Sequence, residues 1–289
     1  MKGLCIFSVD LDDWYHVGWI AGRRSTLLKS SDEAKRLYSG EGLRGPTMTL
    51  LRLFEDFGVR TTFFTQGEIA QEYPDLLETI IAQGHEIGSH DLHHISPNVR
   101  SIEKFSEDVT ESVAIITKIT KEKPTGYRSP NGEFSEAHVN MLQELGFKYD
   151  ASVYPCVPIP GHYGRPFAPT QPYRPSRNNL SKRDPSRQFT EFPFAVVPIL
   201  RIPGGSSWYL RNLGLNVCKL AMRSQLRRGV GCFNMHPYDI SDRVPSFPGL
   251  PRHVFKKVGS EMLSLVKSLL RYLEGRSVFV PFSECIDEI

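Results

Sequence analysis

Short apolar runs alternate with amphipathic stretches along most of the chain. The apolar runs are rich in β-branched and aromatic residues, as in RTTFFT (60–65), which is typical of buried strands. Between the runs, apolar residues recur at helical spacing, most clearly over 101–120. These patterns predict strands at 3–9, 60–65, 85–89, 125–128, 147–152, 191–197, 231–236 and 277–282. They predict helices at 46–58, 68–84 with an interruption at Pro74, 101–120, 135–146, about 211–228 and 253–273.

The alternation of strands and helices indicates a largely parallel sheet. Seven or eight such units in 289 residues predict a (β/α) barrel, and we expect the whole chain, 1–289, to form a single domain. A doubly wound open sheet is the alternative. However, no Gly-rich dinucleotide or phosphate loop follows the first predicted strand, so the barrel is favoured.

One segment, residues 155–193, breaks this rhythm. It holds nine of the 21 prolines together with six basic residues, and we treat about 155–190 as an irregular Pro/Arg-rich insertion. A long irregular segment in a compact domain is usually functional or disordered. The sequence leaves two interpretations open, a solvated surface loop and a segment that faces the substrate.

Composition and charge restrict the class of protein. The apolar fraction of 40% and the charged fraction of 23% are ordinary for a globular protein. A net charge of +3 without a dense Lys/Arg block gives no reason to expect a nucleic-acid partner. No apolar run is long enough to span a bilayer, and Asp10 comes too early for the apolar core of a signal peptide. With five scattered cysteines and no CxxC pair, these features predict a reduced, cytoplasmic protein.

Polar or titratable side chains follow the predicted strands. In a (β/α) barrel, the residues just after each strand converge on one face. The residues at these positions are Asp10, Asp12, His90, His94, Arg128, Asp150 and His236. We therefore expect FSVDLDD (7–13) and GSHDLHH (88–94), which lie far apart in the sequence, to share one site.

The residue types at these positions suit a hydrolytic metal centre. His90 and His94 are four apart, so one helical turn would point both imidazoles the same way. Two imidazoles and one carboxylate form a common hydrolytic zinc set, which leaves one coordination position for water. Asp10 and Asp12 are two apart and face the same side of an extended chain, so one can bind metal while the other takes a proton from water. His236 would then protonate the leaving group.

Each of these residues also has a simpler interpretation. An HxxxH pair alone is weak evidence for a metal site. Asp10 could bond turn amides, Asp150 could cap the turn that follows it, and His236 could be a buried turn histidine. Arg128 could be an ordinary ion-pair partner. The joint pattern favours a site, because the simpler interpretations would have to hold at five separate strand ends.

The same residues resemble those of a known family. TTFFTQGEIAQEYPDLLETIIAQGHEIGSHDLHH (61–94) is similar to the TFF…G…GHEI-SH…H block of the NodB-like polysaccharide deacetylases, carbohydrate esterase family 4. The similarity runs from about residue 4 to 154 and resumes at about 191–238 and 277–282. It implies a deformed (β/α)7 barrel and a hydrolase that removes an N-linked acyl group from a sugar.

The resemblance also implies a role for each residue. Asp10 corresponds to the catalytic base, and Arg128, in GYRSPN, to the arginine that orients the base. His236 corresponds to the catalytic acid, and Asp150 to the carboxylate that tunes this acid. The implied metal ligands are Asp12, His90 and His94. The expected cofactor is one divalent metal ion, zinc in the first place, although cobalt, manganese, nickel or iron suit the same ligands.

The chain departs from the family's common pattern at several points. Many members have adjacent aspartates, TFDDG, whereas SVDLDD here resembles the branch with D-x-D spacing, which includes cytoplasmic deacetylases of bacterial exopolysaccharide and O-antigen pathways. Asp13 is a second, less favoured candidate for the metal ligand. Asn131 stands where an aromatic residue often follows the proline of the arginine motif. PGGSSWYLR (203–211) resembles the same branch more loosely, and its Trp208 and Tyr209 could stack on a sugar ring or pack in the core.

We therefore expect a metal-dependent hydrolase that removes an N-acetyl group from an amino sugar of a bacterial surface polysaccharide or its precursor. Two alternatives stay open: a deformylase or other amidohydrolase acting on a lipid-linked sugar or small amide, and a carbohydrate-binding barrel without turnover. The identity of the sugar, its polymeric, lipid-linked or nucleotide-linked form, and the oligomeric state also stay open. If the substrate carries a diphosphate, basic residues of the insertion are predicted to contact it, among them Arg165, Arg174 and Arg177.

Overall fold

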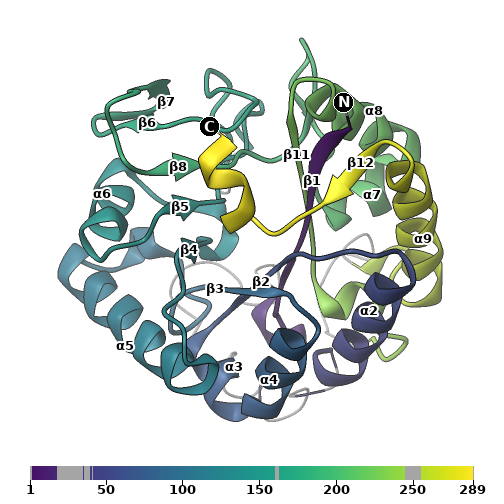
Figure 1. The fold of residues 1–289 in the computed structure, drawn as a ribbon, viewed down its shortest axis with the longest axis horizontal. Coiled ribbons are helices and arrows are strands. Elements are labelled where there is room, and N and C mark those ends of the chain that lie inside the picture. Colours follow the sequence, from purple (N-terminus) through teal and green to yellow (C-terminus); the bar gives the residue numbers. More distant parts are fainter. Residues whose placement is uncertain are drawn as a thin grey trace.

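One curled sheet of parallel strands forms the centre of the molecule (Figure 1). The computed structural model describes residues 2–17, 35, 40, 42–159, 163–244 and 255–288. In this part of the chain the strands follow one another in the order β11-β1-β2-β3-β4-β5-β8, and β12 also pairs with β1. All of these pairings are parallel. The strands are β1 (Gly3–Asp10), β2 (Thr62–Thr65), β3 (Glu86–Ser89), β4 (Gly126–Tyr127), β5 (Tyr149–Asp150), β8 (Thr190–Glu191), β11 (Val230–Met235) and β12 (Ser277–Phe279).

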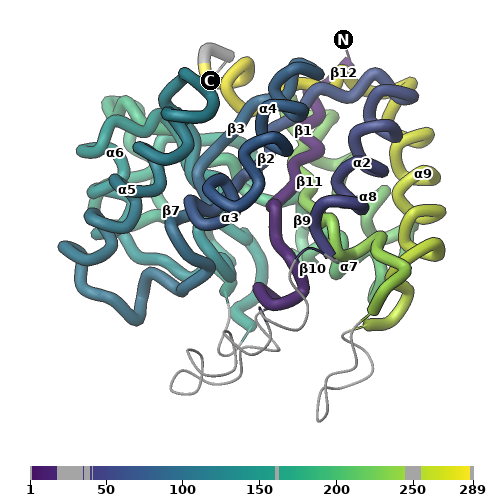
Figure 2. Tube along the Cα trace, turned by 90° about the horizontal axis from the view of Figure 1, so that it is seen from below, coloured from purple at the N-terminus to yellow at the C-terminus, as the bar shows by residue number. Residues whose placement is uncertain are grey.

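Helices surround this sheet on the outside (Figures 1 and 2). They are α2 (Arg44–Asp56), α3 (Gly67–Glu72), α4 (Pro74–Ala82), α5 (Ile102–Thr120), α6 (Glu136–Glu144), α7 (Ser207–Leu213), α8 (Leu215–Leu226) and α9 (Ser260–Glu274). Each buries its apolar stripe, as α5 does with Phe105, Val109 and Ile116. Beneath the helices, Phe7 of β1 stacks on Phe233 of β11 with ring centroids 4.7 Å apart. None of the helices described is both long and apolar enough to cross a bilayer.

The predicted elements agree with the structure except at three places. The helix predicted at about 211–228 is two helices, α7 and α8, which are separated by Gly214 with a φ of 89°. The predicted strand 191–197 is divided, because only its ends are extended: β8 reaches Glu191, and β9 (Val196–Val197) pairs with β10 (Ile202–Pro203) in a separate antiparallel hairpin. The predicted helix 253–273 begins only at Ser260, after Gly259 with a φ of 72°. Its first two predicted residues, 253 and 254, lie outside the described residues.

The predicted insertion folds against the flank of the barrel. Residues 160–162 of it lie outside the described part of the chain. It forms the hairpin β6 (Pro175–Ser176) and β7 (Asn179–Arg183). Tyr173 pairs with Glu191 of β8, and buried Arg187 donates to the carbonyl oxygen of Val139 in α6. Among the described residues, this hairpin takes the place of a crossover helix between β5 and β8.

The parallel arrangement decides where a site can form. Figure 2 shows β1 running from the amino terminus through the barrel to the opposite end. Because the other strands of the sheet run in the same direction, their carboxyl ends lie at that end too. The side chains that follow β1, β2, β3, β4 and β11 therefore meet there.

Candidate active site

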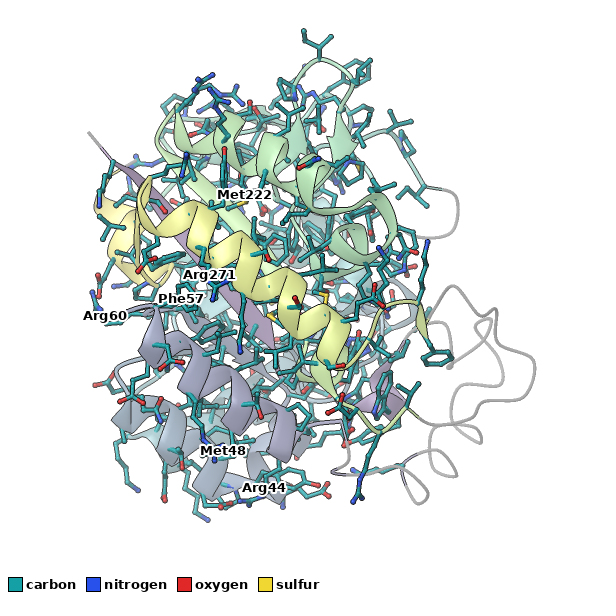
Figure 3. All side chains as sticks on the ribbon, turned by 90° about the vertical axis from the view of Figure 1, so that its right-hand side faces the viewer. Arg44, Met48, Phe57, Arg60, Met222 and Arg271 are labelled. Atoms are coloured by element: carbon teal, nitrogen blue, oxygen red, sulfur yellow. The ribbon has the colours of Figure 1, made fainter. Side chains whose placement is uncertain are left out.

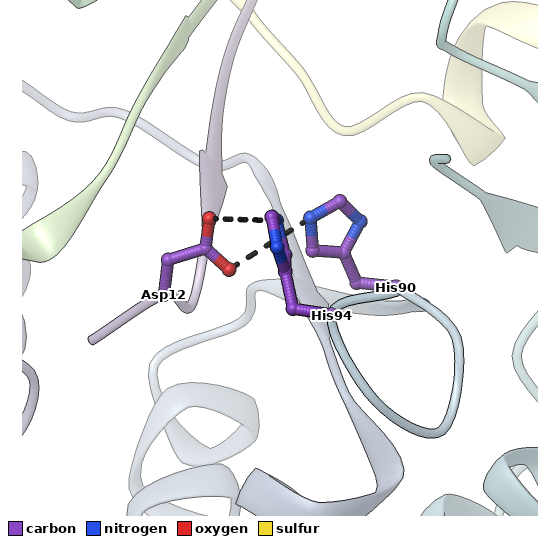
Figure 4. Close-up of side chains that lie close together, drawn as sticks. All are labelled: Asp12, His90 and His94. Atoms are coloured by element: carbon purple, nitrogen blue, oxygen red, sulfur yellow. Dashed lines mark ion pairs between the residues drawn. The ribbon is translucent and has the colours of Figure 1, made fainter. Parts of the chain in front are cut away.

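Three potential metal ligands meet at the carboxyl ends of β1 and β3 (Figure 4). His94 Nε2 lies 3.4 Å from Asp12 Oδ2, and His90 Nε2 lies 3.8 Å from Asp12 Oδ1. One donor atom from each of the three residues lies within 4.8 Å of the other two, a spacing that a single ion can bridge. The two sequence stretches that contain these residues therefore form one site.

The orientation of His90 fits the role of a metal ligand. Its Nδ1 lies 2.7 Å from the carbonyl oxygen of Arg128, so Nδ1 carries the proton and donates it to this oxygen. Its Nε2 is buried beside Asp12 and has no hydrogen-bond partner among the described residues. Burial lowers the pKa of His90, which favours the neutral imidazole that binds metals. A divalent cation would satisfy this buried lone pair while the carbonyl fixes the ring.

Asp12 supplies the negative charge of this set. Gln66, which follows β2, donates a hydrogen bond from Nε2 to Asp12 Oδ1. Burial raises the pKa of Asp12, but the charge and hydrogen bond of His94, with the charges of the two other nearby histidines, hold it well below its usual range. The carboxylate is therefore ionised and available to a cation.

Asp13, the second candidate for the metal ligand, instead binds backbone N–H groups. Its Oδ1 accepts hydrogen bonds from the backbone N–H groups of Trp14 and Gly42, at 2.7 and 2.8 Å. A Cβ added at Gly42 would lie 2.6 Å from this oxygen, so only glycine fits beside it. Asp13 thus caps the turn after β1, and it is not part of the ligand set.

The two histidines do not lie on a helical turn, contrary to the prediction. Residues 90–94 form an irregular loop in which Asp91 adopts a φ of 75°. The buried carboxylate of Asp91 accepts hydrogen bonds from Arg100 Nη2 at 2.6 Å and from the Tyr127 hydroxyl at 2.8 Å. These bonds hold a left-handed residue in place, and the loop can turn both imidazoles to the same side without a helix.

Asp10, the predicted base, is held by two donors. Arg128 Nη1 lies 2.8 Å from Asp10 Oδ1, and Asn234 Nδ2 lies 2.8 Å from Asp10 Oδ2. The same Arg128 nitrogen donates to Ser8 Oγ and to Asn234 Oδ1. The guanidinium is also covered by an aromatic ring, that of Phe64, with its centroid 4.3 Å away. Arg128 therefore lies where an arginine that orients the base is expected.

His236 faces the aspartates from the end of β11. Its Nε2 lies 3.8 Å from Oδ2 of Asp10 and equally far from Oδ2 of Asp12. Its Nδ1 lies 3.2 Å from Asp239 Oδ2, and Asp239 Oδ1 lies 3.2 Å from Arg211 Nη2. Burial lowers the pKa of His236, but the hydrogen bond to Asp239 and the charges of the three surrounding aspartates raise it above its usual value. The protonated form, which a general acid needs, is thereby favoured.

The structure places Asp239, not Asp150, beside the predicted acid. Asp239 lies three residues after His236 in the same short turn, η4 (Pro237–Ile240), so it reaches the imidazole without crossing the barrel. Asp150 is buried against Glu191 and accepts a hydrogen bond from Ser152 Oγ at 2.6 Å. Burial raises the pKa of both acids, and the charge and hydrogen bond of Asp150 raise that of Glu191 further, well above its usual range. These shifts favour the protonated form of Glu191.

Four residues of the site were not predicted: Gln66, Asn234, Asp239 and Arg211. Gln66 directly follows β2, so the strand-end criterion could have found it. Asn234 precedes His236 by two positions and faces the same side of the strand, which is also readable from the sequence. Asp239 and Arg211 gave no such signal, because their contacts depend on the turn η4 and on how α7 docks.

Three further residues that were predicted to contact the substrate form contacts within the protein. Tyr209 is buried, and its hydroxyl lies 2.7 Å from that of Tyr163, so Tyr209 packs in the core. Arg165 forms an ion pair with Glu136 at 2.9 Å, and Arg174 donates to a backbone carbonyl of the insertion. Each contact engages only part of a guanidinium that is not fully buried, so binding of a phosphate by Arg165 and Arg174 stays a prediction.

The fold and the site define a class of protein, a deformed (β/α) barrel with an Asp-His-His set at its mouth. Solved structures share this barrel. The putative polysaccharide deacetylase from Mycobacterium smegmatis aligns over 100% of this chain and 90% of its own, with a TM-score of 0.64 and 16% identity. The allantoinase PuuE aligns over 98% and 89%, with a TM-score of 0.67 and 16% identity. The predicted (β/α)7 fold class is confirmed, but identities this low do not decide the reaction.

Sequence similarity relates part of the chain to a known family. Residues 40–149 match the polysaccharide deacetylase family, and residues 151–286 match a domain of unknown function, DUF3473. The peptidoglycan deacetylase of Helicobacter pylori is 30% identical over 52% of this chain and 49% of its own length. The peptidoglycan-N-acetylmuramic acid deacetylase of Bacillus subtilis is 28% identical over 36% and 40%. The chain thus spans about half the length, or less, of these relatives. The match over residues 40–149 agrees with the resemblance to the polysaccharide deacetylases that the sequence predicted.

Proposed function

We propose that this protein is a metal-dependent hydrolase that removes the N-acetyl group from an amino sugar of a bacterial surface polysaccharide or its precursor. The observation that carries the proposal is the buried, unpartnered Nε2 of His90 in the Asp12–His90–His94 set. Asp10 and His236 face this set, with Asp10 Oδ2 and His236 Nε2 3.8 Å apart. The match to deacetylases over residues 40–149 supports an acyl amide as the bond that is cleaved.

Asp12, His90 and His94 are the proposed ligands of one divalent cation, most simply zinc. When bound, such a cation supplies polarisation of the amide carbonyl and lowers the pKa of a water molecule. Cobalt, manganese, nickel or iron suit the same nitrogen and oxygen donors, so the ligand set alone does not choose among them.

Asp10 is the proposed proton acceptor. Arg128 and Asn234 each bind one of its oxygens, which fixes the plane of the carboxylate and turns Oδ2 toward His236 and His90. A water within hydrogen-bond reach of Oδ2 would lose its proton to Asp10 as it attacks the carbonyl carbon. The backbone N–H of Asn131, which has a φ of 59°, is the proposed donor to the oxyanion.

His236 is the proposed proton donor to the departing nitrogen. Because Asp239 holds the Nδ1 edge of the ring, the Nε2 edge is presented to the site. The side chain is 21% exposed, so a substrate can reach it from solvent. Protonation of the nitrogen by Nε2 releases acetate and leaves a free amino sugar.

The test is release of acetate from a panel of N-acetylated substrates by metal-loaded protein. The panel would contain peptidoglycan fragments, lipid-linked sugars and nucleotide-linked sugars, and the Asp10→Asn variant would be the matched control. We expect acetate from at least one class and a large loss in the variant. Formate in place of acetate would favour the deformylase alternative. Absence of any product from fully metal-loaded protein would reject the proposal and favour a carbohydrate-binding barrel.

A further inference from the structure

Acidic residues are missing from a long stretch of the chain. Residues 192–238 contain no Asp or Glu over 47 positions, whereas the whole chain has 32 such residues, so a stretch of this length would hold about five on average. The stretch contains six basic residues: Arg201, Arg211, Lys219, Arg223, Arg227 and Arg228. The modest net charge of +3 therefore hides a strong local excess of positive charge.

This stretch forms one side of the barrel. It comprises the β9–β10 hairpin, α7, α8 and β11, and Figure 2 shows β9 and β10 beside α7 and α8. In Figure 3, α8, which carries Met222, lies next to α9, which carries Arg271. Arg211 is buried against Asp239. The other five basic residues are partly or fully exposed, and they form no ion pair among the described residues. We call these five residues the basic face: Arg201, Lys219, Arg223, Arg227 and Arg228.

Large apolar side chains project beside the basic face. At the tip of the β9–β10 hairpin, Ile199 is 94% exposed and Leu200 is 66% exposed. Phe167 and Val157 are 85% and 60% exposed. Arg201 ties these segments together, since its Nη1 donates to the carbonyl oxygens of the residues at 155 and 168, at 3.2 and 2.8 Å. We call Val157, Phe167, Ile199 and Leu200 the apolar cap.

The hairpin tip has a strained backbone. Ile199 has a φ of 67° and Arg201 a φ of 53°, both in the left-handed region that a β-branched residue such as Ile199 strongly disfavours. A turn of this kind is usually built from Gly, Asn or Asp. Strain combined with exposed aliphatic side chains indicates a functional surface rather than a connecting loop.

We propose that the apolar cap and the basic face bind an anionic lipid surface. Aliphatic and aromatic side chains at a projecting tip can enter the boundary between headgroups and acyl chains. The neighbouring Lys and Arg side chains then lie at the level of the lipid phosphates, and each strengthens binding to an anionic bilayer by roughly fivefold. This contact is peripheral, and it holds whether or not the barrel is a deacetylase, because it uses none of the residues at the barrel mouth.

Two other occupants of this surface fit the observations less well. A single-stranded nucleic acid would require several aromatic platforms for its bases, and the cap offers one, Phe167. A protein partner would be expected to bury its apolar contact in a pocket with a polar rim, whereas the side chains of the cap are among the most exposed large apolar side chains described. A projecting aliphatic tip bordered by positive charge suits a lipid surface.

The test is sedimentation of the full chain with phosphatidylcholine vesicles that do or do not contain phosphatidylglycerol. We expect binding only to the anionic vesicles, weaker at high salt. Ile199→Ser with Leu200→Ser should reduce binding at least about tenfold, since two apolar side chains no longer leave water. Val278→Ser, which removes an apolar side chain that is 49% exposed elsewhere on the protein, is a control and should bind normally.

Charge is tested separately. Changing Arg223, Arg227 and Arg228 to glutamine should weaken binding roughly a hundredfold, whereas the same change at Lys118, Lys121 and Lys123 should have little effect. Thermal unfolding of each variant checks that it is folded. The proposal would be overturned if the wild type did not bind anionic vesicles at low salt. It would also be overturned if the arginine triple variant and the lysine triple variant lost vesicle binding to the same extent. A concentration-dependent dimer that Ile199→Ser with Leu200→Ser abolishes, without vesicle binding, would assign the surface to a second copy of the chain instead.

Discussion

Asp239→Asn should impair protonation of the leaving group more than any other part of the reaction. Asp239 is completely buried, and its Oδ2 accepts hydrogen bonds from the backbone N–H of His236 at 2.9 Å and from Nδ1 at 3.2 Å. Asparagine keeps the shape of the side chain but removes the negative charge that faces His236 and Arg211. The ring of His236 loses the neighbouring negative charge that favours its protonated form.

The size of the effect follows from these contacts. A positioned general acid contributes about a hundred- to ten-thousand-fold to the rate. Because His236 itself remains, we expect kcat on an N-acetylated sugar to fall by the lower end of this range, about a hundredfold. The variant also leaves Arg211, only 4% exposed, without its carboxylate. Breaking a buried pair of this kind costs on the order of 3–5 kcal/mol, so the free energy of unfolding should fall by a similar amount.

The assay compares two substrates of the same enzyme. An amide nitrogen must be protonated to leave, whereas the leaving group of 4-nitrophenyl acetate departs without a proton. Asp239→Asn should therefore slow hydrolysis of the sugar amide strongly and that of the ester by less than about fivefold. Arg211→Lys keeps a positive charge beside Asp239 and is the matched control, with a smaller loss on the amide. Equal losses on both substrates, or no loss on the amide, would refute this role of Asp239.

Three further changes test other parts of the site. Asp10→Asn should retain metal by elemental analysis and lose about a hundred- to ten-thousand-fold on both amide and ester, because both need an activated water; loss of metal would show that Asp10 is a ligand. Burial and the charge of Asp150 raise the pKa of Glu191, so the folded chain keeps a proton that the unfolded chain releases above about pH 4, and wild-type stability should fall as pH rises from there. In Glu191→Gln, the free energy of unfolding, measured by urea denaturation at several pH values, should decline less steeply with pH. The same decline as in the wild type would contradict a raised pKa of Glu191. Arg100→Leu should lower the free energy of unfolding by about 3–5 kcal/mol, because it leaves the buried charge of Asp91 without its ion pair. Loss of the exposed Lys104, which pairs with Asp108, should have little effect.

The barrel could be predicted because its signals are local. Every residue of the run GLCIFSV except Ser8 is apolar, as expected for a strand that is buried on both faces. The structure has β1 at this place. The convergence of Asp12 with His90 followed from topology alone, since parallel strands end on one side. The geometry of the histidine loop did not follow. Spacing of four suggested a helical turn, but the loop is shaped by Asp91 through Arg100, a contact that the spacing does not encode.

The identity of the carboxylate beside His236 shows the same limit. The family resemblance assigned this role to Asp150, which also lies at the end of a predicted strand. Asp239 reaches His236 through a turn that begins with a proline, and turn geometry of this kind is fixed by tertiary packing. The insertion is a further case, because its basic residues suggested a free surface for an anion. Arg187 instead caps carbonyl oxygens inside the fold, a role that composition does not distinguish from binding.

Acetate release measured against metal occupancy tests directly whether one bound metal ion is needed for deacetylation. Chelated protein would be titrated with zinc, and acetate from an N-acetylated substrate would be measured at each ratio, for the wild type and for the double variant His90→Ala with His94→Ala. We expect activity to rise with occupancy and to level off at one ion per chain. The double variant should stay folded but neither bind stoichiometric metal nor release acetate. Full activity without metal, or a wild-type metal content in the double variant, would contradict this expectation.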